Sequence, residues 1–324
     1  MVAIRGYGTY IPVYRIERET IATQHGDYPS SGEVSVPASD EGIVSLGVNA
    51  ASNALEHAAV EAADLDAVFA ATMSDPFDER GVASNVGYAV GIDPQTRIAD
   101  FEGSQRAAVD AILAGRDAIE ADRAKTVLVV ATDIRRATAG SSAEQTAGAG
   151  AAAVVLDADG DVASLDGAAV NTTGFVGRFT PAGGSPVEGK VPFNRDRFVE
   201  EVAEAIGEIG TADIAAIPAP GDDWGDRVLS ALDSDAERPS TFADIGDAGT
   251  ASVLLDLALV LENAAPDDRL LVAAGGPGGC AALALEVDDV TRATPMTTQD
   301  YIESKDYVTY SKHRSFREPT GGNA

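Results

Sequence analysis

The side chains that could carry out covalent chemistry are few in this sequence. Ser104 follows an apolar segment and opens a stretch with helical spacing, while the sole cysteine, Cys280, follows the glycine-rich turn at residues 275–279. A serine becomes a nucleophile only beside a general base, whereas a serine at the start of a helix commonly caps it. Both roles of Ser104 stay open. Cys280 lies on an apolar strand segment, which predicts a small buried hydrophobe.

The three histidines do not supply an obvious base. His25 lies in an early loop segment, His57 in the middle of an alanine-rich helical segment, and His313 near the C-terminus. For His57 we expect a solvated or half-buried position on its helix. No spacing typical of metal ligands, such as His-Glu-x-x-His, occurs in the chain, so the sequence predicts no metal site.

The charge composition restricts the class of protein. Of the 324 residues 52 are acidic and 23 basic, which gives a net charge of −29, and only four are lysines (Lys125, Lys190, Lys305 and Lys312). The acidic residues are scattered, which favours adaptation to a salt-rich cytoplasm, as in a halophilic archaeon, over a clustered acidic interaction surface. Nucleic-acid binding is disfavoured because it requires basic patches. No signal peptide or membrane span is evident, so we expect a cytoplasmic protein.

Apolar segments and helical segments alternate along the chain, which predicts an α/β architecture. We predict strands at 66–72, 96–101, 125–132, 151–156, 269–274 and 281–289, and helices at 40–63, 80–91, 104–122, 194–209, 224–231 and 251–263. The apolar segment at 151–159 has a counterpart at 281–289, an offset of 130 residues, which suggests two duplicated halves. We therefore divide the chain into an N-terminal half (1–165), a C-terminal half (166–289) and a polar tail (290–324), with the Gly- and Pro-rich residues 160–191 as the connection.

Four segments resemble known sequences, namely residues 6–16 (GYGTYIPVYRI), 35–41 (SVPASDE), 144–153 (EQTAGAGAAA) and 307–314 (YVTYSKHR). In this order they resemble archaeal hydroxymethylglutaryl-CoA synthases of the thiolase superfamily, with ketoacyl-acyl-carrier-protein synthase III as the next nearest relative. The resemblance implies a five-layered α-β-α-β-α fold made of two halves around paired buried helices. It also implies a homodimer and a coenzyme A thioester as substrate or ligand, with no bound cofactor.

The resemblance also locates a divergent site. Ser104 stands where the family has its nucleophilic cysteine, Met73 where it has a glutamate, Pro218 where it has a histidine, and Asp247 where it has an asparagine. Asp247 could act as a base for Ser104 or simply begin a helix, and the second role is the more common one. The turns containing Gly246, Gly275 and Gly276 are implied to lie at the substrate, where a glycine-rich loop can donate an oxyanion-hole N–H.

Two kinds of function follow from these residues. The first is a thiolase-fold acyl-CoA acyltransferase or condensing protein that uses Ser104 or no covalent step. The second is a non-catalytic acyl-CoA-binding or scaffold subunit, paired with a thiolase-type chain or with a small zinc-ribbon/OB-fold protein of the kind that accompanies archaeal thiolases. Whether the chain is an enzyme stays open at the level of sequence.

Overall fold

The predicted strands assemble into one large mixed sheet. The computed structural model describes residues 1–77, 79–181, 184, 186–289 and 292–317. Within these residues a nine-stranded sheet has the order β11 (Ile214–Ala216), β12 (Arg269–Gly276), β13 (Gly279–Val287), β8 (Ala163–Thr172), β1 (Ala3–Tyr10), β7 (Ala149–Asp157), β6 (Thr126–Ile134), β4 (Ala67–Thr72) and β5 (Arg97–Glu102). Strands β1 and β8 pair only at Ala3 with Ser164 and at Ile4 with Ala163. The sheet therefore consists of two half-sheets that are joined only by this short pairing of β1 with β8.

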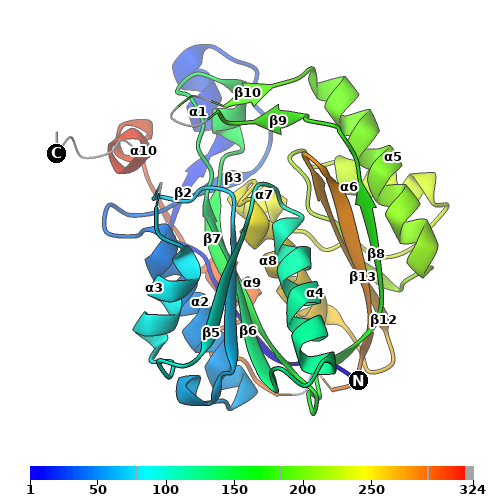
Figure 1. Cartoon of the computed structure of the whole chain (residues 1–324). Coiled ribbons are helices and arrows are strands. Elements are labelled where there is room, and N and C mark those ends of the chain that lie inside the picture. Colours follow the sequence, from blue (N-terminus) through cyan, green and yellow to red (C-terminus); the bar gives the residue numbers. More distant parts are fainter. Residues whose placement is uncertain (78, 182–183, 185, 290–291, 318–324) are drawn as a thin grey trace.

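Helices lie between and outside the half-sheets in five layers (Figure 1). Helices α2 (Ile43–Ala58) and α3 (Val82–Val90) cover the first half-sheet, and α5 (Val191–Ile209) and α6 (Trp224–Ala231) cover the second. Helices α4 (Ala107–Glu120) and α8 (Thr250–Asn263) fill the middle. Every residue of α8 from Thr250 to Leu261 is buried, as expected for a helix that is apolar on all sides. The structure thus confirms the predicted five-layered α/β fold.

The two halves repeat one plan. In each, a central helix (α4 or α8) leads into a strand (β6 or β12) that pairs antiparallel with the next (β7 or β13). The bounds of β7 and β13 differ by the predicted offset of 130 residues. The outer strand β5 has no full counterpart in the second half, where only the parallel bridge between Ile214 and Glu237 occupies that place. The duplication inferred from sequence is therefore a structural repeat.

Several predicted boundaries are wrong. Residues 160–191 are not merely a connection, because they contain the ten-residue strand β8 and the short strands β9 (Arg178–Phe179) and β10 (Val187–Glu188). Helix α2 begins after Gly42 rather than at residue 40. Helix α4 begins at Ala107 rather than at residue 104, because residues 103–106 form a turn in which the Ala107 N–H donates to the Ser104 carbonyl at 3.0 Å.

The C-terminal residues return to the first half of the chain. Strand β14 (Asp306–Tyr307) extends a small sheet with β2 (Tyr14–Glu17) and β3 (Glu33–Val36). Helix α10 (Tyr310–Arg317) brings Arg314 within 3.2 Å of the buried Glu144 carboxylate in the 3-10 helix η2 (Ser142–Gln145). The remaining helices are α1 (Arg18–His25), α7 (Phe242–Ile245), α9 (Thr298–Glu303) and the 3-10 helix η1 (Ala62–Asp64). None of the described helices is both long enough and apolar enough to span a bilayer.

Candidate functional site

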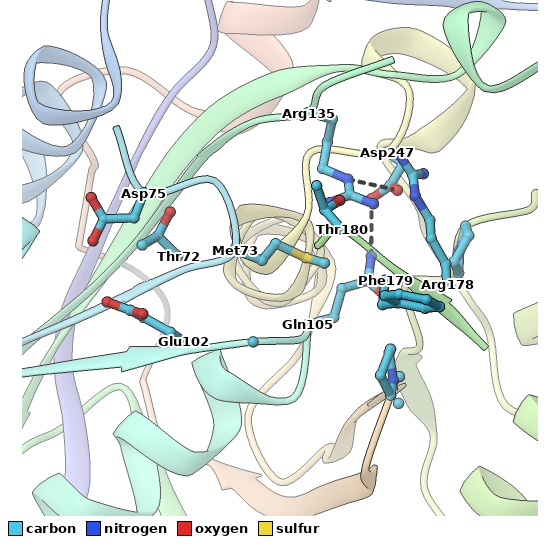
Figure 2. Close-up of a pocket in the computed structure, with 15 residues that line it drawn as sticks. Thr72, Met73, Asp75, Glu102, Gln105, Arg135, Arg178, Phe179, Thr180 and Asp247 are labelled. Carbon is cyan, nitrogen blue, oxygen red and sulfur yellow. Dashed lines mark hydrogen bonds and ion pairs between the residues drawn. The ribbon is translucent and has the colours of Figure 1, made fainter. Parts of the chain in front are cut away.

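A cavity of about 270 Å³ opens where the parallel strands end. Strands β4, β5, β6 and β12 all point their carboxyl ends toward it, which is the usual place for a ligand in an α/β sheet. Figure 2 shows side chains from both halves of the chain meeting in this space. The lining residues are Thr72, Met73, Asp75, Glu102, Gly103, Gln105, Arg135, Arg178, Phe179, Thr180, Pro220, Asp247, Gly275, Gly276 and Pro277.

Asp247 lies in the wall of this cavity with its carboxylate fully engaged. Its Oδ2 contacts Arg135 Nε at 3.1 Å, and its Oδ1 accepts from Gln105 Nε2 at 3.0 Å and from the Gly249 N–H at 2.9 Å. All three side chains are buried, and the first two contacts are drawn in Figure 2. Charge-assisted hydrogen bonds of this kind hold a carboxylate in one orientation. They link Asp247 to Arg135 and Gln105 in the cavity wall.

A second buried carboxylate, Asp133, lies behind the cavity at the end of β6. Its Oδ1 accepts from the Thr72 hydroxyl at 2.9 Å, from the Met73 N–H at 2.8 Å and from the Ser74 hydroxyl. Its Oδ2 accepts from the N–H and hydroxyl of Thr250 at 2.7 and 2.6 Å. Burial nevertheless raises the pKa of Asp133. Asp133 thereby ties the end of β4 to the first turn of α8 and fixes the cavity wall.

Ser104 does not line the cavity, although its neighbours Gly103 and Gln105 do. The residue is only 7% exposed, and its side chain lies against the glycine-rich loop, since a carbon added at Gly276 would be 3.0 Å from Ser104 Cβ. No side chain caps α4, whose N-cap position is Arg106. Among the described residues the Ser104 hydroxyl has no recorded hydrogen bond to a histidine, carboxylate or any other base. The Ser104 side chain therefore does not cap α4.

Only some of the other residues assigned from the resemblance lie at the cavity. Met73, Asp247, Gly275 and Gly276 line the cavity, whereas Pro218 and Gly246 do not. Pro218 is buried next to β11, and the cavity is reached instead by Pro220, two residues further on. The backbone conformation requires glycine at residue 246, because the φ of Gly246 is +79° and a side chain there would collide with the Thr146 carbonyl.

An adjoining cavity of about 250 Å³ is mostly apolar. It shares Arg178, Pro220, Gly275, Gly276 and Pro277 with the first cavity. Its further walls include the apolar side chains Phe175, Val191, Phe198, Val202 and Trp224. The two spaces meet at the glycine-rich loop between β12 and β13, so one ligand with a polar and an apolar part could occupy both.

The three histidines and the cysteine lie outside both cavities. His57 is buried, contrary to the solvated or half-buried position we expected: its Nδ1 accepts from the Tyr7 N–H at 3.1 Å, and its Nε2 donates to the Arg292 carbonyl at 3.2 Å. His25 and His313 lie near Glu144, away from the cavity. Cys280 is fully buried, as predicted, and burial raises the pKa of its thiol to about 11. None of these four side chains lines either cavity.

Sequence reasoning missed the residues that define the electrostatics of the cavity, namely Gln105, Asp133, Arg135, Arg178 and Glu102. A signal was available for two of them, because Asp133 and Arg135 directly follow the apolar segment 125–132, where a parallel strand delivers polar groups to a site. Gln105 and Glu102 flank Ser104 but follow no recognised motif. Among the described residues no group of three or more His, Cys, Asp or Glu side chains is arranged to hold a metal ion.

Comparisons with known proteins agree with this architecture. The chain is 29% identical to the hydroxymethylglutaryl-CoA synthase of Methanopyrus kandleri over 98% of its own length and 97% of that protein. A solved hydroxymethylglutaryl-CoA synthase complexed with CoA superposes with a TM-score of 0.85 at 18% identity, covering 98% of this chain and 91% of the other. The 3-oxoacyl-(acyl carrier protein) synthase III of Pseudomonas aeruginosa superposes with a TM-score of 0.79 at 21% identity, covering 89% and 98%. No protein-family model matches the chain.

The five layers, the internal repeat and the cavity at the strand ends define a thiolase-fold protein. Within that fold the chain is hydroxymethylglutaryl-CoA synthase-like, since its sequence is similar to archaeal proteins of that name over nearly its whole length.

Proposed function

We propose that this protein binds an acyl-CoA thioester in the two adjoining cavities and forms no covalent acyl-enzyme. The observation that carries the proposal is the position of Ser104, which lies against Gly276 and outside the cavity lining, with no recorded hydrogen bond to a base in the described part of the chain. A serine hydroxyl without a base is not nucleophilic enough to attack a thioester. The resemblance implies that Ser104, Met73 and Pro218 stand where the family has its Cys, Glu and His, and Asp247 is engaged by Arg135.

The shape and charge of the cavities support an acyl-CoA ligand. The apolar cavity suits an aliphatic chain, and the polar cavity offers Arg135, Arg178 and Gln105 to a thioester or amide group. Lys190 precedes Val191 in the apolar wall, and Arg136 follows Arg135. Both are exposed, and neither has a recorded ion pair in the described part of the chain. In a protein of net charge −29, two such cations near the cavities favour a phosphate-bearing ligand.

Calorimetric titration with CoA and acetyl-CoA in molar salt tests this proposal. We expect saturable binding that weakens in Lys190→Glu and Arg136→Glu. The matched control is Lys125→Glu, which makes the same charge change just before β6, at a residue that lines neither cavity. Equal affinities for all four proteins, or no binding, would contradict the assignment of this site.

A second candidate is acyl transfer or condensation with a transient acyl-serine. It is favoured by the close approach of Gly276 to Ser104, because a backbone N–H in that loop could stabilise an oxyanion. Intact-mass measurement after incubation with acetyl-CoA separates the two. An acetyl adduct that is absent from Ser104→Ala would support this second function.

The assembly we propose is a homodimer, alone or with a thiolase-type or zinc-ribbon/OB-fold partner. Strand β5 lies at the edge of the sheet with much of its length exposed, including Ile98, and such an edge can pair with a second copy. Light scattering and native co-purification in molar salt test the assembly. A monomer with no companion would contradict it. The cytoplasm of a salt-adapted archaeon remains the setting we propose from the charge composition.

A further inference from the structure

One loop between β6 and β7, residues 135–147, contributes to the walls of both cavities. Arg135 at its start lines the polar cavity. The carbonyl of Arg136 accepts a hydrogen bond at 3.0 Å from Arg178, which lines both cavities. The loop residues that line the apolar cavity are Ser142, Ala143 and Thr146. The position of this loop therefore sets the shape of the whole ligand site.

The loop has little regular structure of its own. Residues 135–141 belong to no helix or strand, and η2 adds a single 3-10 turn. Arg136 and residues 138–140 are exposed. Segments with few buried contacts and few regular hydrogen bonds open most easily in the native state. The loop therefore depends on the elements that pack against it.

Helix α10 binds both ends of the loop through one guanidinium group. Arg317 donates to the carbonyls of Arg135 and Ala147, the second at 2.6 Å, and to that of Ser35 at 3.3 Å. Burial lowers the pKa of Arg317 only to about 10, so the side chain is a cation at neutral pH. Hydrogen bonds from a charged donor are roughly twice as strong as neutral ones. Arg317 thus joins α10 to the residue whose side chain contacts Asp247.

The same helix binds the middle of the loop through the buried carboxylate of Glu144. This carboxylate accepts from Arg314 at 3.2 Å and from the Tyr310 hydroxyl at 3.1 Å, both on α10. It also accepts from the Gly140 N–H at 2.6 Å, within the loop itself. Figure 1 shows α10 (red) on the outside of the molecule, apart from the layers of the fold. Its release would therefore free the loop without taking a layer apart.

We propose that α10 is a latch, a helix whose docking holds the 135–147 loop in place, and that Arg317 and Glu144 are positioning residues for the ligand site. With α10 docked, the loop completes the walls of both cavities, and with α10 released the walls open. Docking of α10 and binding of the ligand are then coupled, and each favours the other by the same factor. The coupling rests on the acyl-CoA function given above, whereas the latch itself does not.

The latch is tested without ligand on the full-length protein in molar salt, by hydrogen–deuterium exchange and by acrylamide quenching of fluorescence. Trp224 reports on the apolar cavity, because it is the sole tryptophan and lines that cavity. We expect Arg317→Met to speed amide exchange across residues 136–147 about tenfold or more and to make Trp224 easier to quench. The control Lys312→Met removes an exposed cation from the same helix and should change neither readout.

The coupling is tested by calorimetric titration of the same proteins with CoA and acetyl-CoA. Couplings between two sites are typically about 5- to 150-fold, so we expect Arg317→Met to weaken binding about tenfold and Lys312→Met to leave it unchanged. In the wild type, the bound ligand should slow amide exchange in α10. Glu144→Gln keeps an acceptor oxygen but removes the charge, so both its loop exchange and its affinity should lie between those of the wild type and Arg317→Met.

The two parts of the inference fail in different ways. Exchange of residues 136–147 that stays at the wild-type rate in both Arg317→Met and Glu144→Gln would overturn the latch. A faster-exchanging loop with unchanged affinity would overturn the coupling and leave the proposed binding function standing. If neither CoA nor acetyl-CoA binds the wild type, the proposed function is refuted and the coupling with it, while loop exchange in the two variants still decides whether α10 is a latch.

Discussion

Replacing Arg135 should show most clearly how much the buried ion pair in the cavity wall contributes to the free energy of unfolding. Arg135→Met keeps a long apolar side chain but removes the guanidinium that lies 3.1 Å from the Asp247 carboxylate. The two side chains are 8% and 3% exposed. Breaking such a buried pair leaves an uncompensated charge and costs about 3–5 kcal/mol. Since a domain is stable by only about 5–15 kcal/mol, the variant should lose a large share of its free energy of unfolding.

The assay is urea unfolding in molar salt, followed by the fluorescence of Trp224. This is the sole tryptophan, and it is buried against Phe198 with ring centroids 5.5 Å apart. The control is Arg227→Met, which removes the partner of Asp223 from a pair whose side chains are 50% and 57% exposed. That pair should be worth no more than about 1 kcal/mol, and less at a Debye length of about 3 Å.

The double variant Arg135→Met, Asp247→Asn completes the test, because it removes both charges. We expect it to be more stable than Arg135→Met alone, since no buried charge remains unpaired. If Arg135→Met is as stable as the Arg227→Met control, or if the double variant is the less stable of the two Arg135 variants, the role given to this ion pair is wrong.

Three further predictions concern single side chains. Ser104→Ala should bind acetyl-CoA as tightly as the wild type by calorimetry, because the hydroxyl lies outside the cavity lining; a clear loss of affinity would place it in contact with the ligand. The Cys280 thiol should resist alkylation in the native state, as monitored by intact mass, since it is fully buried and its pKa is raised to about 11; rapid labelling in buffer without urea would contradict this. Burial raises the pKa of Asp256 from 3.8 to about 6, so between these pH values the native state keeps a proton that the unfolded chain releases. The free energy of unfolding should therefore fall by about 3 kcal/mol as the pH rises from about 4 to about 6. Asp256→Asn should remove that decline in urea titrations across this pH range, and identical pH profiles for the two proteins would refute the assignment.

The alternation of apolar and helical segments predicted the α/β class, because buried elements leave a pattern in the sequence, whereas the five layers were implied by the resemblance. Strands such as β6 and β7 are mostly continuous apolar runs, and α8 is mostly apolar on every side, as is usual for buried elements. The 130-residue offset between β7 and β13 was visible for the same reason. Strand β8 was missed because its burial varies from residue to residue and it contains Gly167 and Asn171, which are uncommon in strands.

The site could be predicted only in part, because its chemistry depends on contacts between distant residues. Ser104 looked like the first residue of a helix, yet Gly103 adopts a φ of +102° and the chain makes one more turn before α4 begins. Asp247 looked like a base or a helix start until the structure placed Arg135, 112 residues away, against it. Pro220 rather than Pro218 reaches the cavity because residue 218 is covered beside β11.

The central claim is that the cavity binds an acyl-CoA thioester without covalent capture on Ser104. Its most direct test is to saturate the protein with acetyl-CoA in molar salt, confirm occupancy by calorimetry, and measure the intact mass of the same sample. We predict full occupancy with an unchanged protein mass. A mass increase of one acetyl group that disappears in Ser104→Ala would contradict the claim.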